Sequence, residues 1–480
     1  MNRRMVLYTV GTVIKIEAVL MLLPTVCALI YKESCVKALL ISVAVSLAAG
    51  FALTLISRPG NKVIYSREGF ITVALAWLAL SFFGALPFYI SGEIPRFIDA
   101  FFETVSGFTT TGASILPDVE AMSKGLLFWR SFTHWVGGMG VLVFIMAIIP
   151  ALSDRNIHLL RAEVPGPIVG KLVPRMRQTT RILYIIYIAL TLVEIFLLLI
   201  GDMPLFEALV HAFGTAGTGG FGVKADSIAS YSPYLQWVIT VFMLLFGINF
   251  NVFYLIILGK FRSAFKSTEL WAYLGIVAVS TAAITVNILP MTESLSVSFR
   301  DAAFQVSSII TTTGYATADF DKWPELSKTI LLALMFIGAC AGSTGGGIKV
   351  SRIVILAKSV KREIKKLLHP RSVSVLRFEG KKLEEQTVSS VSSYLAVYIF
   401  FFAGILLLLS FENQSLETNF SAAAACFNNI GPGFAAVGPT QNFDIYSPFS
   451  KLILSLAMLF GRLEIYPLFI AFSPSTWIKK

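Results

Sequence analysis

Long apolar stretches recur along this sequence, and they constrain its fold more than any other feature. A stretch of about 20 apolar residues can cross a hydrocarbon core of roughly 30 Å as a helix. Charged residues make up 14% of the chain, against about 25% in a soluble domain. The sequence therefore predicts an all-α, multi-pass membrane protein without a large soluble domain. We expect ten spanning helices, at about residues 6–31, 36–56, 71–90, 126–149, 182–200, 235–258, 270–289, 330–356, 391–409 and 452–472.

The net charge of +11 is concentrated in alternate loops. Basic residues are dense at 150–181 and 349–389 and occur at both ends of the chain, whereas the opposite loops hold mostly acidic residues. If ten helices alternate, all the basic segments lie on one side, which the positive-inside rule identifies as the cytoplasm. We therefore expect both termini to be cytoplasmic, in a plasma (inner) membrane. This pattern argues against nucleic-acid binding, which a basic soluble protein would suggest.

The first apolar stretch has an alternative interpretation as a signal peptide. It extends from Val6 to Tyr31, which is longer than the apolar region of such a peptide. No small-residue cleavage site is evident. We expect it to be the first membrane helix.

Four semi-polar intervals between the predicted helices resemble one another, and all lie on the predicted outer side. Each is rich in Gly, Thr and Ser. They align without gaps from Asp99, Glu207, Asp301 and Thr418, and each then has a glycine at the thirteenth following position. These glycines are Gly112, Gly220, Gly314 and Gly431. The chain thus reads as two leading transmembrane helices and four helix–re-entrant P-loop–helix repeats around one pore.

The composition of these intervals fits an ion filter. A re-entrant segment must satisfy its backbone against protein or water. Its first part can be a half-helix, and its Thr/Gly part can return as extended backbone whose carbonyl oxygens replace the hydration shell of a cation. Such backbone needs dihedral angles that glycine adopts most cheaply. The alternative is that Gly and Thr only pack helices together, but a register shared by four loops favours the pore. The candidate filter residues are Thr110, Thr111, Gly112, Thr218, Gly219, Gly220, Thr312, Thr313, Gly314, Asn429, Ile430 and Gly431.

Two further features lie at membrane depth. A Gly/Ser/Thr run at 338–347 interrupts an apolar segment, and such a run cannot form a stable helix. It is tolerated where it lines a cavity, or it is a kink for close packing. Arg462 lies in the last apolar segment, where an arginine is expensive and by default functional. Alternatively, Arg462 neutralises Glu464 or caps loose carbonyls.

Other polar residues in the spans have structural interpretations. We assign Arg130 and His134 to structure, and we expect Lys15 and Glu17 to snorkel or pair. Two nucleotide-binding motif matches are rejected. The G-x-G-x-x-G match at 217–222 lacks a preceding strand. The P-loop-like stretch at 342–349 has its lysine one place late.

Seven motifs together give a resemblance that covers essentially the whole chain. The sequence resembles the superfamily of Trk, Ktr and HKT potassium transporters, and most closely the TrkH-type pore-forming subunit. The two leading helices and the NIGPG form favour this type over the shorter Ktr-type. The motifs are SGFTTTGA, HAFGTAGTGGFG, SIITTTGY, NNIGPGF, FWRSFTHWVGGMG, GSTGGGIKV and GRLEIYPLF.

The resemblance implies one key filter glycine in each repeat and selectivity for potassium over sodium, since some sodium-favouring plant relatives carry serine in the first loop. The second loop reads GTAGTGGF where relatives often read STxSTGGF, which makes the neighbouring Gly219 an alternative, but the shared register selects Gly220. The resemblance also implies a gate below the filter, made by a flexible loop and an arginine. The matching residues are Gly342, Gly345, Gly346, Gly347, Lys349 and Arg462.

The resemblance further implies a separate cytosolic, nucleotide-binding regulatory subunit (TrkA-like) and a homodimer. The only ligand expected in this chain is K⁺ as the transported ion, with no cofactor. The expected units are residues 1–68 (two leading helices), 69–160 (pore repeat 1), 161–262 (pore repeat 2), 263–385 (pore repeat 3 with the gating loop and a basic cytoplasmic segment) and 386–480 (pore repeat 4).

Two other classes of function share some of these features. A secondary transporter of another solute, coupled to Na⁺ or H⁺, also uses repeats and broken helices, although its repeats are usually two and often inverted. A membrane-embedded enzyme is disfavoured because the histidines (134, 158, 211 and 369) and cysteines (27, 35, 340 and 426) show no paired catalytic or metal spacing. The cysteines are expected to be small buried residues. We therefore expect potassium uptake, channel-like or coupled to Na⁺ or H⁺, and no enzymatic activity.

Overall fold

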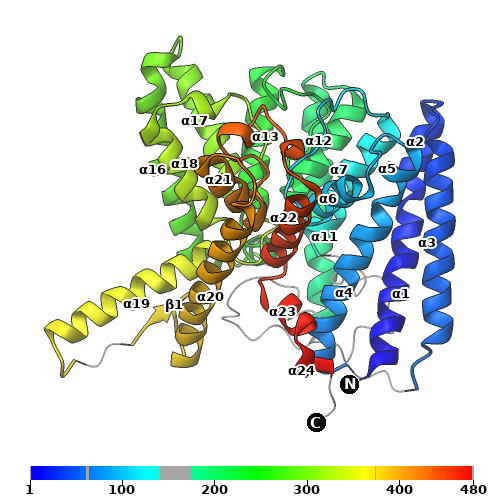
Figure 1. Cartoon of the computed structure of the whole chain (residues 1–480). Coiled ribbons are helices and arrows are strands. Elements are labelled where there is room, and N and C mark those ends of the chain that lie inside the picture. The colour runs from blue at the N-terminus through cyan, green and yellow to red at the C-terminus, as the bar shows by residue number, and fades with distance from the viewer. Residues whose placement is uncertain (1, 61–63, 141–175, 373–374, 478–480) are drawn as a thin grey trace.

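The computed structural model describes residues 2–60, 64–140, 176–372 and 375–477, and these are nearly all helical (Figure 1). Within them, β1 (Arg377–Phe378) and β2 (Lys381–Lys382) form one short antiparallel hairpin. Helix α19 projects away from the rest of the helices in Figure 1, with the hairpin close to it. The remaining helices stand side by side, as expected of a membrane protein.

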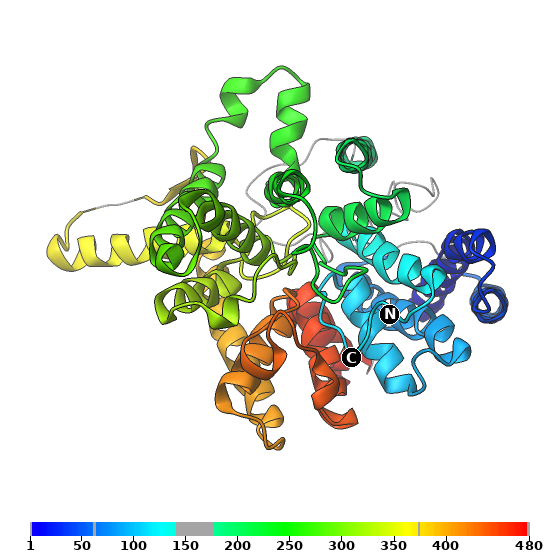
Figure 2. The same ribbon diagram turned by 90° about the horizontal axis from the view of Figure 1, so that it is seen from above.

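The leading helices are packed closely through small residues. Helix α1 (Arg3–Leu20) continues after a break as α2 (Leu22–Ile30), and α3 (Val36–Ile56) runs back along α1. A Cβ atom on Gly50 would lie only 2.9 Å from the carbonyl oxygen of Gly11, so the two backbones touch where both residues lack side chains. These helices lie at one edge of the molecule in both views (Figures 1 and 2).

After the leading helices, one order of elements recurs four times. A long helix is followed by a shorter helix, an extended segment and another helix. The long helices are α4 (Ser66–Gly84), α11 (Met176–Ile200), α16 (Thr268–Ile288) and α20 (Glu385–Leu409). The shorter helices are α6 (Phe97–Phe108), α12 (Leu205–Gly217), α17 (Leu295–Ile310) and α21 (Leu416–Phe427). The closing helices are α7 (Lys124–Gly138), α13 (Pro233–Phe246), α18 (Glu325–Ile337) and α22 (Pro448–Arg462).

Viewed from above, these four groups occupy successive sectors around a common centre (Figure 2). Further elements of the described residues lie between and after these groups. They are α5 (Leu86–Ser91), α14 (Phe250–Ile257), α15 (Phe261–Ala264), η1 (Leu289–Met291), η2 (Phe320–Lys322), α19 (Val350–Leu368), η3 (Ala435–Val437), η4 (Phe443–Ile445), α23 (Tyr466–Phe472) and α24 (Pro474–Trp477).

Six helical stretches of the described residues are long and apolar enough to cross a membrane, or seven if a bent pair counts as one span. The six are Arg3–Ile30, Val36–Ile56, Arg67–Ser91, Arg181–Ile200, Thr268–Met291 and Glu385–Leu409. Large apolar side chains on these helices are exposed, among them Val279, Val286 and Phe400. Water would disfavour such surfaces, so they are lipid-facing, and the prediction of a multi-pass membrane protein is confirmed.

Three of the predicted spans are not continuous helices. The span predicted at 235–258 bends by 89° between α13 and α14, next to Gly247 and the N-cap Asn249. The span at 330–356 is broken between Ile337 and Val350, and the one at 452–472 ends at Arg462 before α23 begins. The break after Ile337 agrees with the predicted interruption at 338–347. The bend after α13 and the end of α22 at Arg462 were not predicted, because averaged hydropathy does not register short breaks in apolar sequence. Of the span predicted at 126–149, α7 covers the residues up to Gly138, and residues 141–149 lie outside the described part of the chain. Residues 150–175 of the predicted basic segment at 150–181 also lie outside it.

The beginning of α1 and the end of the last helix lie next to each other. Arg3 donates a hydrogen bond of 3.0 Å to the carbonyl oxygen of Trp477, and Arg67 donates one of 3.2 Å to that of Ser475. The first and last described residues are thus at the same end of the molecule (Figure 1).

Candidate ion pathway

The four shorter helices end in the same backbone conformation. Two residues before each glycine of the shared register, the chain adopts a left-handed conformation, which is uncommon for residues with side chains. These residues are Thr110, Thr218, Thr312 and Asn429, with φ of 56°, 56°, 60° and 57°. The amide of the next residue then bonds the carbonyl five positions back, as in a Schellman cap. These bonds are Thr111→Ser106 (2.9 Å), Gly219→Gly214 (2.8 Å), Thr313→Ser308 (2.8 Å) and Ile430→Ala425 (2.9 Å).

The four glycines that follow also share a conformation that requires glycine. Their φ angles are 81° at Gly112, 78° at Gly220, 86° at Gly314 and 101° at Gly431. In this region a Cβ atom is strained. Gly219, the alternative to Gly220 in the sequence, does not have a positive φ in this structure. It stands where Thr111, Thr313 and Ile430 stand in the other segments, as the shared register predicted.

The four glycines close a ring of backbone contacts. A Cβ atom on Gly112 would overlap the carbonyl oxygen of Gly219, one on Gly220 that of Thr313, and one on Gly314 that of Ile430. A Cβ atom on Gly431 would lie 2.8 Å from the carbonyl oxygen of Thr111. Each segment therefore touches the next, and the fourth returns to the first. All four glycines also line one cavity of about 140 Å³, together with the stretch 437–443.

A pair of threonine hydroxyls supports each of two segments, the first and the third. Thr111 bonds Thr109, and Thr313 bonds Thr311, each with 2.8 Å between the hydroxyl oxygens. Asn429 of the fourth segment donates to the Thr111 hydroxyl at 2.9 Å. The candidate residues of all four segments are thus brought together in one region of the molecule.

The Gly/Ser/Thr run lies directly against the ends of the shorter helices. No helix covers 338–349 in the described chain, and the Gly346 amide donates to the Thr312 hydroxyl at 2.6 Å. A Cβ atom on Gly346 would overlap the carbonyl oxygen of Asn428. Lys349 is buried and donates to the carbonyls of Gly345 and Gly346. The run therefore contacts both the third and the fourth segments.

Arg462 joins this run to the end of α7. Its guanidinium donates to the carbonyl oxygens of Thr344 (2.8 Å), Gly137 (2.5 Å) and Gly138 (2.8 Å). Capping of loose carbonyls, one of the readings left open by the sequence, is therefore part of what Arg462 does. Glu464 is bound through both carboxylate oxygens by Arg352, at 2.8 and 2.7 Å.

Sequence reasoning missed the residues that hold the run from the other side. The buried Glu269 carboxylate accepts from the amides of Ala341 (2.7 Å) and Ser351 (3.1 Å). The bend of the second group also contacts the run, since Phe250 donates to the Gly342 carbonyl at 3.1 Å. Glu269 could have been found in the sequence as a carboxylate at the start of an apolar span, because a buried charge at membrane depth needs partners.

Lys15 and Glu17 of the first helix, which were expected to snorkel or pair, differ in their contacts. Lys15 donates to the Thr54 hydroxyl at 3.2 Å. Glu17 is 1% exposed and neither carboxylate oxygen has a hydrogen-bond partner among the described residues, so the expectation that it snorkels or pairs was wrong. It is held instead between α1 and α4, next to Gly84. The four cysteines are free and buried, as predicted.

The fold and this region define the class of the protein. It is an integral membrane protein in which four backbone segments meet around one axis. The family of cation transport proteins named TrkH matches residues 36–273 and 270–480. The chain therefore belongs to the TrkH family.

Individual relatives match over nearly their full length. The Trk system potassium uptake protein TrkH of Salmonella typhimurium is 35% identical over 99% of this chain and 100% of its own. TrkG of Escherichia coli is 35% identical over 99% of this chain and 98% of its own. The crystal structure of the potassium transporter TrkH from Vibrio parahaemolyticus superposes with a TM-score of 0.90, at 33% identity, over 100% of both chains.

Proposed function

We propose that this chain takes up potassium through a pore whose filter is formed at Gly112, Gly220, Gly314 and Gly431. The closed ring of contacts between these glycines and the neighbouring carbonyls is the observation that carries the proposal. Carbonyl oxygens from four segments can replace the hydration shell of K⁺. The names of the relatives as potassium uptake proteins support the same ion.

The proposed filter comprises the three residues of each segment that end at the ring glycine. They are Thr110, Thr111 and Gly112; Thr218, Gly219 and Gly220; Thr312, Thr313 and Gly314; and Asn429, Ile430 and Gly431. The four-repeat architecture belongs to the same proposal, with units at 1–68, 69–160, 161–262, 263–385 and 386–480. The recurrence of one cap and one glycine conformation supports it.

The proposed gate is the run at 338–349 together with Arg462. Its position against Thr312 and Asn428 supports an obstruction next to the filter. The positive charges of Lys349 and Arg462 would repel a permeating cation, more strongly as the local dielectric falls. We also propose cytoplasmic termini, a homodimer and a cytosolic nucleotide-binding subunit that moves the run; the basic helix α19, which follows the run directly, offers such a subunit a surface.

The test is cation flux into proteoliposomes that contain the purified chain. K⁺ or Rb⁺ should enter in preference to Na⁺, and Gly112→Ser should weaken this preference, because a side chain there meets the carbonyl of Gly219. Gly404→Ser is the matched control, since no atom lies within 4 Å of its Cβ position. Unchanged selectivity in all four Gly→Ser variants would exclude the filter. Flux that requires a Na⁺ or H⁺ gradient would favour the coupled transporter instead.

A further inference from the structure

Helix α7 is wedged between the shorter helices of the first and second segments. Its Gly137 approaches the carbonyl of Phe108 so closely that a Cβ atom there would overlap the oxygen. On the other side, a Cβ atom on Gly217 would overlap the carbonyl of His134. This close packing places the side chains of α7 directly behind the two filter segments.

His134 of α7 joins these two segments through its ring. Its Nδ1 lies 2.7 Å from the carbonyl oxygen of Gly107 in α6, and its Nε2 lies 3.3 Å from the amide nitrogen of Phe221. A carbonyl can only accept and an amide N–H can only donate. Both bonds therefore form only in the neutral tautomer that carries its proton on Nδ1.

The same ring fills a space that the second segment leaves empty because two of its residues have no side chains. The hydroxyl pairs Thr109–Thr111 and Thr311–Thr313 support the first and third segments. In the second segment the matching positions are Gly217 and Gly219, which have no side chains. A Cβ atom on Gly219 would overlap the ring atoms of His134. The imidazole thus stands where the second hydroxyl of the pair would be.

Arg130, one helical turn before His134, holds the next part of both segments. Its Nε lies 2.5 Å from Glu103 of α6, and its Nη1 donates to the Gly222 carbonyl at 3.2 Å. The guanidinium lies 3.5 Å from the centroid of the Phe221 ring. Glu103 in turn accepts from the Ser114 hydroxyl and the Ile115 amide, both at 3.0 Å. Arg130 and Glu103 are almost fully buried.

We propose that His134 and Arg130 are positioning residues for ion selectivity: they fix the second filter segment against the first, and His134 replaces the hydroxyl pair that Gly217 and Gly219 cannot form. This inference rests on the proposed function, because it concerns the same filter. It goes beyond that function in assigning selectivity to a helix outside the four re-entrant segments.

The first test separates the two hydrogen bonds of His134. His134→Asn can keep a donor near Gly107 but loses the acceptor for Phe221, and His134→Gln can keep that acceptor. In proteoliposomes the ratio of K⁺ to Na⁺ flux should fall about fivefold in His134→Asn, the size expected from losing one hydrogen bond. In His134→Gln the ratio of K⁺ to Na⁺ flux should fall less, because the acceptor for the Phe221 amide is kept. Trp135→Phe is the control, because the indole N–H of Trp135 bonds the Thr191 hydroxyl of α11 and neither filter segment.

The second test asks whether His134 replaces a side chain at position 219. Gly219→Thr alone should reduce K⁺ selectivity because the new side chain meets the imidazole. His134→Ala alone should reduce it because the space is left empty. The double variant should be more selective than either single variant, since the threonine then occupies the vacated space. All fluxes are compared at equal amounts of monodisperse protein, so that a loss of folding is not counted as a loss of selectivity.

The outcomes separate this inference from the proposed function. If the wild type shows no K⁺ preference, the proposed function fails. If the wild type prefers K⁺ but His134→Asn, His134→Ala and Arg130→Gln keep the wild-type ratio, the positioning role is excluded. If the losses of K⁺ selectivity in Gly219→Thr and His134→Ala add up in the double variant, His134 does not take the place of the hydroxyl pair.

Discussion

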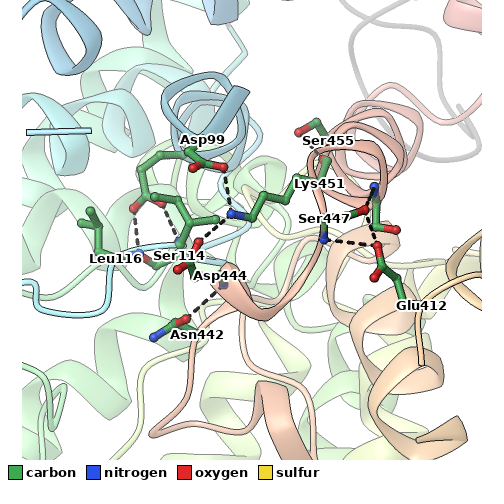
Figure 3. Close-up of polar contacts among 12 residues, drawn as sticks. Asp99, Ser114, Leu116, Glu412, Asn442, Asp444, Ser447, Lys451 and Ser455 are labelled. Atoms are coloured by element: carbon green, nitrogen blue, oxygen red, sulfur yellow. Dashed lines mark hydrogen bonds and ion pairs between the residues drawn. The ribbon is translucent and has the colours of Figure 1, made fainter. Parts of the chain in front are cut away.

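Lys451 of α22 and Asp99 of α6 form a buried ion pair, with 2.8 Å between the ammonium nitrogen and a carboxylate oxygen. Figure 3 shows the Lys451 side chain between Asp99 and Asp444, whose carboxylate lies 2.6 Å from the same nitrogen. Lys451 is 1% exposed. The pair joins α22, the closing helix of the fourth group, to α6, the shorter helix of the first group, so it fastens the fourth group to the first.

We predict that Lys451→Met lowers the free energy of unfolding by about 3–5 kcal/mol, because it leaves the buried Asp99 carboxylate without its cation. Thermal unfolding of the detergent-solubilised protein measures this. Lys322→Met is the control: Lys322 pairs with Asp319 at 3.1 Å but is 80% exposed, and such a pair contributes about 0–1 kcal/mol. Equal shifts in the two variants would contradict the prediction.

The glycine register was predictable from the sequence because it depends on backbone geometry. A positive φ and a close backbone approach both require glycine, so Gly112, Gly220, Gly314 and Gly431 are visible as one recurring residue. The choice of Gly220 over Gly219 followed from the same register. The break at 338–349 was also predictable, since its composition opposes a helix.

The remaining features depend on contacts between distant parts of the chain. Glu269 holds Ala341 through a hydrogen bond across 72 positions of sequence, and nothing near Glu269 in the sequence indicates that partner. The bend after Phe246 is stabilised by the run at 338–349, so local hydropathy could not reveal it. The exchange of a hydroxyl pair for His134 likewise needs the packing of α7 against α12.

The second prediction concerns Glu269. Replacing it by Ala leaves the buried amides of Ala341 and Ser351 without an acceptor, at about 1–3 kcal/mol for each unsatisfied group. The run at 338–349 should then be less firmly held, and basal K⁺ flux should rise. Rb⁺ uptake per folded protein measures it, with the exposed Glu293→Ala as control. If Glu269→Ala is less stable but has wild-type flux, Glu269 stabilises the fold without controlling the proposed gate.

The third prediction concerns pH. Glu412 accepts hydrogen bonds from the hydroxyl and amide of Ser447, the N-cap of α22 (Figure 3). The hydroxyl bond holds the pKa of the Glu412 carboxyl below its usual value. A lowered folded-state pKa stabilises the fold above the unfolded pKa of about 4.3, and this contribution is lost as pH falls through the folded pKa.

Glu412→Gln should therefore lower the unfolding temperature slightly at pH 7, by the equivalent of about 0.5 kcal/mol, since the site is partly exposed. The difference from wild type should shrink as the pH is lowered from 5 to about 3. Unfolding temperatures of both proteins over this range measure it. A difference that stays constant with pH would show that the charge of Glu412 does not contribute.

The fourth prediction concerns the proposed gate. Arg462 bonds the carbonyl of Thr344 in the run and those of Gly137 and Gly138 at the end of α7. Arg462→Ala removes a positive charge and three hydrogen bonds that hold the run next to the third and fourth segments. Deletion of 341–346 shortens the run itself. If the run obstructs the pathway, both variants should raise basal K⁺ flux per folded protein.

A purely structural Arg462 predicts a different result. Loss of its bonds would then lower thermal stability and flux together, because the carbonyls of α7 and of the run lose their donors. Arg300→Ala is the control for loss of an arginine, since Arg300 pairs with Asp301 at 3.5 Å, away from the run. Flux is compared at equal amounts of monodisperse protein with the unfolding temperature measured beside it. If neither Arg462→Ala nor the deletion exceeds wild-type flux, the run at 338–349 does not obstruct the pathway. In that case the pathway would be as closed without Arg462, or without part of the run, as it is in the wild type.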